Sequence, residues 1–329
     1  MALWLVLRSP LGVDRDACMV LSYFVKQQSN VIQTNTITPT TIKHELEGTV
    51  MAGLGILAFS FTLPFTRIVA PELGGTFVGL GRALVATLIA IVVLLARGER
   101  LPERRHWIPL LVTALGVVVG FPLLSSLAMQ SVPSIHGVVI VGLLPAMTAA
   151  LGVLRTRERT TPLFWVAVGI GIVGILVFAM IEGAGKPQPA DALLLGAGIL
   201  GALGYVEGGR LSKELEGWRV ISWALVFSSP FLIVPVLLNW PQHPELVSLP
   251  AWLSFAYVSA ISMYVAFFAW YRGLALAGIA RSSQLQLVQP ILSITWAALI
   301  LHEVIHWQTI FAAAIVLASI TLSRMARHQ

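Results

Sequence analysis

The chain repeats itself at nearly half its length, inside long apolar segments. A proline followed thirteen positions later by a glutamate occurs at Pro145 and Glu158, and again at Pro290 and Glu303, so the second copy lies 145 residues after the first. The run Gly-Leu-Gly-Ile-Leu that starts at Gly53 returns 143 residues later as Gly-Ala-Gly-Ile-Leu. A repeat of this length within apolar sequence predicts a duplicated membrane protein.

The composition indicates a chain that is surrounded by lipid. Hydrophobic residues make up 57% of the 329 residues and charged residues 11%, whereas a soluble domain carries about 25% charged residues. A helix needs about 20 mostly apolar residues to span a bilayer. Ten such windows occur, at residues 50–69, 76–96, 107–128, 134–154, 163–181, 192–209, 220–240, 251–271, 282–301 and 307–323. We therefore expect an all-α integral membrane protein with ten transmembrane helices.

The basic residues predict the orientation of these helices. If the first helix starts in the cytoplasm, the outer loops contain Lys186 alone among Lys and Arg, whereas the inner loops and the C-terminal tail contain 14 basic residues. Retention of Lys and Arg in the cytoplasm produces this bias. We expect a multi-pass inner-membrane protein with both termini in the cytoplasm. The net charge of +6 then reflects topology and does not indicate a nucleic-acid partner. The inner basic residues are Arg97, Arg100, Arg104, Arg105, Arg155, Arg157, Arg159, Arg210, Lys213, Arg219, Arg272, Arg281, Arg324 and Arg327.

The duplication divides the chain into three parts. Residues 1–48 are polar over much of their length and are expected to form a largely unstructured cytoplasmic leader. Residues 49–182 and 191–325 are expected to form the two repeats, each with five helices. Because five is odd, the second repeat must enter the membrane from the opposite side, which gives an inverted pair with a substrate site near the midplane. This arrangement favours a transporter that works by alternating access.

The pattern also resembles a known family, the EamA branch of the drug/metabolite transporter superfamily. The resemblance extends from about Val50 to Arg324 and rests on both proline-to-glutamate segments, the small-residue first helix of each half, and the run GRALVA at Gly81–Ala86. In that family the glutamate usually follows a glycine, whereas here it follows Arg157 and His302. The resemblance implies a ten-helix carrier that exports metabolites, amino-acid-like compounds or drugs.

Two short motifs suggest other chemistry. His302, Glu303 and His306 match the zinc-protease pattern H-E-x-x-H, which requires both histidines on one face of a continuous helix. These residues instead straddle an expected outer loop, and the repeat already accounts for Glu303. The G-x-G-x-x-G runs at Gly169 and Gly196 lack the βαβ context of a dinucleotide site and fit close helix packing. We expect no enzyme activity, no cofactor and no metal, and keep a membrane zinc protease as an unfavoured alternative.

Helix nine carries the best candidate for a substrate path. Ser282, Gln286, Gln289 and Ser293 are spaced by 4, 3 and 4 residues and share one helix face. The equivalent positions of the fourth helix are mostly apolar, which predicts a cavity with one polar wall. Tyr264 lies near the expected midplane, where it can stack on or hydrogen-bond a substrate. The alternative is that these side chains only hydrogen-bond neighbouring helices.

Three ionisable residues fall within the expected helices. Arg82 lies about one and a half turns inside helix two, His136 near the outer start of helix four, and Glu207 near the cytoplasmic end of helix six. A charge at a helix centre costs about 2.5–3.5 kcal/mol on insertion scales, but near an end the side chain can reach the interface. Arg82 is a candidate for attracting an anionic group or bracing a helix carbonyl. His136 and Glu207 are candidates for proton coupling or gating.

The sequence thus predicts a secondary transporter that exports small organic solutes, with the bilayer and a small molecule as its partners. A flippase for lipid-linked precursors is a second transport hypothesis. Glycine-rich faces on helices five and six can pack helices within one chain or between two, so a homodimer is also predicted as an alternative.

Overall fold

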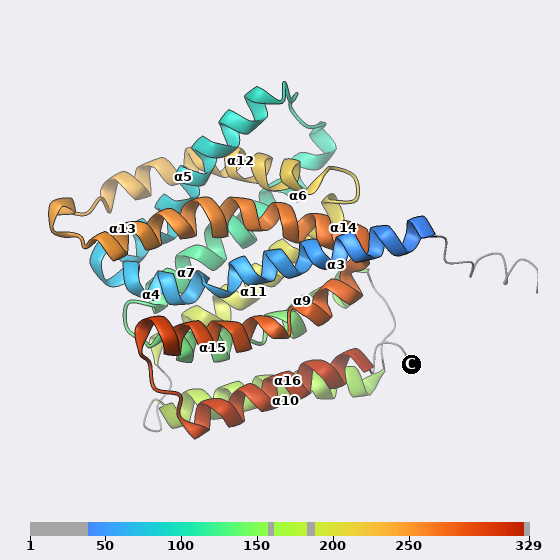
Figure 1. Ribbon diagram of the computed structural model, residues 1–329, viewed down its shortest axis with the longest axis vertical. Helices are drawn as coiled ribbons and strands as arrows, with labels where there is room; N and C mark the ends of the chain where they lie inside the picture. The colour runs from blue at the N-terminus through green and yellow to red at the C-terminus, as the bar shows by residue number, and fades with distance from the viewer. Residues whose placement is uncertain (1–38, 157–160, 183–187, 326–329) are drawn as a thin grey trace, which may run out of the picture. The chain divides into compact units, whose positions relative to one another are not determined.

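The computed structural model describes residues 39–156, 161–182 and 188–325, which fold into helices with no strand in those ranges. The chain divides into residues 1–44 and residues 45–329, and only the second unit is considered below. Figure 1 shows its helices. They are α3 (Pro39–Ser60), α4 (Thr62–Leu73), α5 (Gly75–Ala96), η1 (Arg104–His106), α6 (Trp107–Thr113), η2 (Ala114–Gly120), α7 (Phe121–Ala128), α8 (Ser134–Val141), α9 (Leu144–Thr156), α10 (Pro162–Glu182), α11 (Pro189–Leu211), α12 (Gly217–Leu238), η3 (Pro244–Leu246), α13 (Leu249–Ala256), η4 (Tyr257–Val265), α14 (Ala266–Leu285), α15 (Val288–Leu301) and α16 (Trp307–Met325).

Seven stretches of the described residues are long and apolar enough to cross a bilayer. Three further apolar helices, Pro162–Phe178, Val288–Leu301 and Trp307–Leu322, are shorter. The prediction of an all-helical chain with many membrane-spanning segments is confirmed at this level. The seven stretches are Leu46–Leu73, Gly75–Ala96, Arg104–Ala128, Ser134–Arg155, Pro189–Leu211, Gly217–Leu238 and Leu249–Ala277.

The predicted start of the ninth helix differs from the start in the structure. The sequence suggested a loop at about residues 272–281, but α14 is helical to Leu285 and the interruption falls at residues 286–287. Gly273 has no positive φ, in contrast to Gly74 (φ 82°), which separates α4 from α5. The helix ends instead where Pro290 removes the N–H that the carbonyl of Gln286 requires.

Helices from the two halves of the chain pack in pairs. α5 packs on α12, α10 on α16, and α8 on α15, and Figure 1 shows α10 and α16 side by side. α11 packs on η2 and α7, while α4 packs on α13 and η4. Each half therefore contributes to every one of these interfaces, and the polypeptide core is shared between the halves.

Glycines allow the close approach in two of these interfaces. A side chain at Gly171 or Gly174 of α10 would meet Ser319 or Ile315 of α16. Along α11, a side chain at Gly204 would meet the backbone of η2. Backbones at such contacts can come together only where no Cβ intervenes. For these glycines, the sequence allowed packing within one chain or between two, and the contacts described here lie within one chain.

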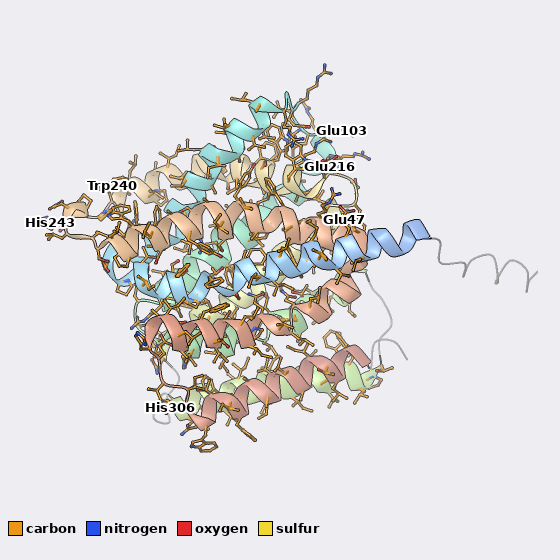
Figure 2. All side chains as sticks on the ribbon, viewed as in Figure 1. Glu47, Glu103, Glu216, Trp240, His243 and His306 are labelled. Carbon is orange, nitrogen blue, oxygen red and sulfur yellow. The ribbon has the colours of Figure 1, made fainter. Side chains whose placement is uncertain are left out.

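The loops gather at two opposite ends of the helices. Acidic residues at one end pair with arginines there, as Arg219 does with Glu99 (2.5 Å) and Arg272 with Glu47 (2.5 Å). This is the end at which the sequence places the basic loops. Figure 2 labels three residues at each end, Glu47, Glu103 and Glu216 at the first and Trp240, His243 and His306 at the second.

Candidate functional site

Prolines lie at interruptions of three of the membrane helices. Pro64, Pro145 and Pro290 lie in the first turn of α4, α9 and α15. The helix before Pro64 ends at Ser60 and the helix before Pro145 ends at Val141, in both cases four residues before the proline. The helix before Pro290 ends at Leu285, one residue earlier than in the other two cases. A proline has no N–H for the carbonyl four residues before it and its ring clashes with that carbonyl, so the helix breaks there.

Two more of the membrane helices contain widened turns. η2 and η4 are π-helical segments of seven and nine residues within the third and eighth expected spans. Pro122, the second residue of α7, lies two positions after the end of η2 and again removes a backbone donor. Helix distortions of this kind occur frequently at functional sites. No single residue of η4 accounts for its widened turn.

A cavity lies where the broken and widened helices meet. Its space open to the centre of a water molecule is about 50 Å³, which is room for a few waters at about 10–15 Å³ each. The first turns of α4, α9 and α15 all contribute to its wall. The lining residues are Phe59, Thr62, Leu63, Arg82, Val117, Phe121, Val138, Val141, Gly142, Leu144, Gly201, Tyr205, Ser262, Met263, Phe267, Gln289, Pro290 and Ser293.

Side-chain hydroxyls repair the backbone at the break between α3 and α4. Ser293 donates its hydroxyl to the carbonyl of Ser60 at 2.7 Å, which is the carbonyl that Pro64 leaves without a helical partner. The indole N–H of Trp296 donates to the Ser60 hydroxyl at 2.9 Å. Thr62 and Ser262 share a further hydrogen bond at 2.7 Å. In a bilayer, freed backbone groups persist only where such partners exist.

Arg82 is buried in the cavity wall without a partner. Its side chain is 2% exposed, and neither Nε nor Nη1 has a hydrogen-bond partner among the described residues. An unpaired charge inside a membrane protein is costly, by about 2.5–3.5 kcal/mol at a helix centre on insertion scales. Long basic side chains usually extend to the membrane interface, but the guanidinium of Arg82 lies inside the protein.

Comparison with known proteins decides the family. The EamA-like transporter family matches this sequence twice, over residues 46–180 and 188–325. The chain belongs to the EamA-like transporter family. The family is one of membrane transporters, which agrees with the spanning helices described above.

Two proteins that are similar to this EamA transporter are also named as transporters. It is 42% identical over 271 residues to the uncharacterized transporter YdeK of Bacillus subtilis (strain 168), which covers 82% of this chain and 94% of that protein. The uncharacterized transporter YyaM of the same organism is 19% identical over 74% of this chain and 82% of its own length. A solved structure described only as a protein crystal structure shares the fold, with a TM-score of 0.59, 15% identity and coverage of 85% of this chain and 97% of that chain.

The structure separates the residues that the sequence proposed for the path. Gln289 and Ser293 line the cavity together with Arg82. Gln286 is buried outside the lining, with Oε1 unpartnered among the described residues. Tyr264 also lies outside the lining and shares a 2.8 Å hydrogen bond with Ser222 of α12. The side chain of Ser282 falls outside the described residues.

His136 and Glu207 lie at opposite ends of α11 and away from the cavity. His136 of α8 is 2.6 Å from Asp191 in the first turn of α11, and both side chains are buried. Glu207, in the last turns of α11, pairs with Arg155 of α9 at 2.7 Å and with Arg210 at 3.2 Å. α11 is therefore tied at both ends to the broken helix formed by α8 and α9.

Glu303 has a clear structural role at the start of α8. Its two carboxylate oxygens accept hydrogen bonds from the backbone N–H groups of Ser134 and Ile135, each at 2.7 Å. A carboxylate at a helix N-terminus satisfies orphan donors and interacts favourably with the helix dipole. Residues 302–306 form a non-helical connection, and His302 has φ 55°. The two histidines thus do not share the helix face that a zinc-protease motif requires.

The sequence analysis missed several groups at the site. Tyr205 lines the cavity and packs against Phe59 and Phe267, at centroid distances of 6.3 and 6.2 Å. Asp191 carried a signal, because Gln188 and Asp191 form a capping box at the start of α11.

Proposed function

We propose that this EamA transporter is a secondary carrier with ten transmembrane helices in two inverted five-helix repeats. The repeats would be residues 49–182 and 191–325, preceded by a cytoplasmic leader at residues 1–48. It would export small organic metabolites, amino-acid-like compounds or drugs across the inner membrane by alternating access, with both termini in the cytoplasm. The family, the spanning helices and the basic loops support this proposal.

The packing pairs support the inverted repeat. If the first five expected helices are exchanged with the last five, the pairs α5–α12 and α10–α16 each turn into themselves. The pair α8–α15 joins expected helices four and nine, which also exchange with each other. The packing of α11 on η2 and α7 turns into that of α4 on η4 and α13. A pseudo-two-fold axis in the membrane plane has this effect, and inverted repeats of transporters are related in the same way.

The observation that carries the proposal is the cavity among the proline-broken helices. Transporter sites form near the midplane from discontinuous helices at the interface between repeats. Here α4 and α9 belong to the first family match, and α15 belongs to the second. Gln289, Ser293 and Arg82 are proposed to line the path, while Gln286 and Tyr264 would brace the wall that holds them. For Ser282, the proposal that it lines the path rests on the sequence alone.

Alternating access requires that the two ends of the cavity open in turn. The pairs His136–Asp191 and Arg155–Glu207 join α11 to the same broken helix at opposite ends. We assign His136 and Glu207 to gating, because loosening either pair would let one end of α8 and α9 move while the other end stays fixed. A two-state element with opposed contacts is what such a transition needs.

The test is transport by the purified protein in proteoliposomes. A library of small metabolites and drugs is first screened by thermal shift, and each hit is then measured in counterflow with Gln289→Ala and the exposed loop variant Gln242→Ala. We expect saturable counterflow, with KM raised at least about fivefold by Gln289→Ala and unchanged by Gln242→Ala, because one hydrogen bond to substrate is worth about 1 kcal/mol.

Three outcomes would contradict the carrier. Equal behaviour of the two glutamine variants would remove the cavity from the transport path. Movement of a fluorescent lipid between leaflets without solute counterflow would favour the flippase. One bound zinc per chain, with proteolysis that Glu303→Gln abolishes, would favour the protease.

A further inference from the structure

Every acidic side chain that the structure describes already has a partner other than Arg82. Most of these partners are basic side chains, and the others are backbone N–H groups, a serine or a tryptophan. The pairs are Glu47 with Arg272, Glu72 with Ser248, Glu99 with Arg219, Glu103 with Arg105, Asp191 with His136, Glu207 with Arg155, Glu214 with His106, Glu216 with Trp218, Glu245 with His243, and Glu303 with the start of α8. None of the described carboxylates is left to neutralise Arg82.

The cavity around Arg82 is positive in character. Its lining contains no aspartate or glutamate and no second cation among the described residues. The first turns of three half-helices, α4, α9 and α15, contribute to its wall. Helix N-termini favour anions, but the last turns of α3 and α8, which carry the opposite partial charge, also line the cavity through Phe59 and Val141. The net positive charge of the cavity therefore comes from Arg82.

The rest of the wall suits an apolar body with one polar end. Phe59, Phe121, Phe267 and Tyr205 supply aromatic surface. Gln289 supplies an amide that can donate to a carboxylate oxygen. A guanidinium binds a carboxylate through two parallel N–H donors, and such charge-assisted pairs are about twice as strong as neutral hydrogen bonds.

We propose that Arg82 is the binding residue for the carboxylate of a small, net-negative organic acid with an apolar body. This inference rests on the proposed function, since it takes the cavity as the substrate path, and it narrows the solute class to organic anions. A cationic compound would meet Arg82 with like charge. A zwitterion would bring an ammonium group for which the lining offers no carboxylate.

The first test separates a ligand-binding arginine from a bracing one without any substrate. Arg67 provides the matched control, because its Nη1 donates to the carbonyl of Met129 at 2.7 Å and it lies outside the cavity lining. In ligand-free protein we expect Arg82→Met to raise the melting temperature, since removing an unpaired buried charge is stabilising. Arg67→Met should lower it. A fall for Arg82→Met as large as that for Arg67→Met would overturn the proposal.

The second test measures recognition of charge with two matched sets of probes. Phenylacetate, phenylacetamide and phenethylamine share one apolar body, and hexanoate, hexanamide and hexylamine share another. We expect only the two carboxylates to raise the melting temperature of the wild-type protein. Their affinity should fall about thirtyfold or more in Arg82→Met, as expected for loss of one partner of a buried ion pair. Arg82→Lys should retain part of the affinity, because it keeps the charge but not the planar fork.

Phenylphosphonate tests whether the site takes any anion of this shape or carboxylates in particular. A larger melting shift with phenylphosphonate than with phenylacetate would overturn the assignment to a carboxylate. Shifts from the amides or amines that equal those from the acids, or no shift from any of the probes, would overturn the proposal as a whole.

Counterflow distinguishes this inference from the transport function itself. Saturable movement of amides or amines that Arg82→Met leaves intact would refute the anion site and leave the carrier standing. If the wild-type protein showed no counterflow of any compound in the library, the proposed function itself would be refuted. Counterflow of a carboxylate that Arg82→Met abolishes and Arg67→Met preserves would support both.

Discussion

The hydrogen bond from Ser293 to Ser60 shows how single side chains make a broken helix stable in lipid. Pro64 deprives the Ser60 carbonyl of its helical donor, and the hydroxyl of Ser293, from the other half of the chain, replaces it at 2.7 Å. An unsatisfied backbone group in the hydrocarbon region is costly. The residue that the sequence selected for its polar face is therefore engaged in holding the cavity wall together.

Replacing Ser293 by alanine should destabilise the protein by about 1 kcal/mol, because a buried carbonyl loses its donor. Thr295→Ala is the matched control on the same helix, since Thr295 is exposed and its hydroxyl bonds the carbonyl of Ile291 in its own helix. Unfolding in mixed detergent measures both. Equal losses in the two variants would mean that the Ser60 carbonyl finds another donor.

Sequence reasoning reached some residues of the site and not others, for a physical reason. Gln289 and Arg82 were visible because a polar or charged residue stands out within an apolar span. Tyr205, Phe59 and Phe267 were not, because aromatic residues are ordinary in any membrane helix and only the tertiary fold brings them to one cavity. The partnership of Asp191 with His136 likewise joins residues 55 positions apart.

At the scale of helices, the proline of the repeated proline-to-glutamate segment says more about the cavity than the glutamate does. Pro145 and Pro290 mark equivalent interruptions, and the starts of α9 and α15 that they create both reach the cavity. The spacing that occurs twice within the chain predicted the duplication. The apolar windows, in contrast, predicted each membrane span as one unbroken helix. Hydropathy does not register a break whose backbone groups are satisfied by neighbouring helices.

Pro290→Ala should reduce transport at least about tenfold while preserving the fold, because alanine restores the N–H that can join α14 to α15 and thereby changes the cavity wall. Pro189→Ala is the control, since Pro189 lies in the first turn of α11, where a proline costs little. Counterflow and hydrogen exchange at residues 286–290 measure the two effects. Unchanged exchange at these amides would show that the break does not depend on the proline.

At the scale of the whole molecule, α11 is fastened to α8 and α9 by one polar pair at each end. The all-helical architecture followed from the long apolar windows of the sequence. The family followed from the resemblance that the two proline-to-glutamate segments and the run GRALVA carry. The two polar pairs at the ends of α11 could not be predicted from the sequence, because each depends on how distant helices are placed side by side. The sequence marked His136 and Glu207 as ionisable, and the fold supplies their partners.

Weakening the two polar pairs separately should separate α11 from its neighbouring helices at opposite ends of α11. Asp191→Asn weakens the pair with His136, and Glu207→Gln weakens the pairs with Arg155 and Arg210. Spin labels placed at each end of α11 and the facing helix should show a wider distance only at the end where the pair was weakened. Each variant is the control for the other. Widening at the same end in both would contradict two independent gates.

The placement of Arg82 also bears on energy supply. Its guanidinium is fixed to α5, so its charge stays with the protein when a bound anion departs, and each export cycle would move one negative charge out of the cell. In a cell with a negative interior, 100 mV is worth about 2.3 kcal/mol per charge, which sustains a concentration ratio of roughly fiftyfold. The resting membrane voltage alone would then draw an organic anion outward, with no coupled ion to carry.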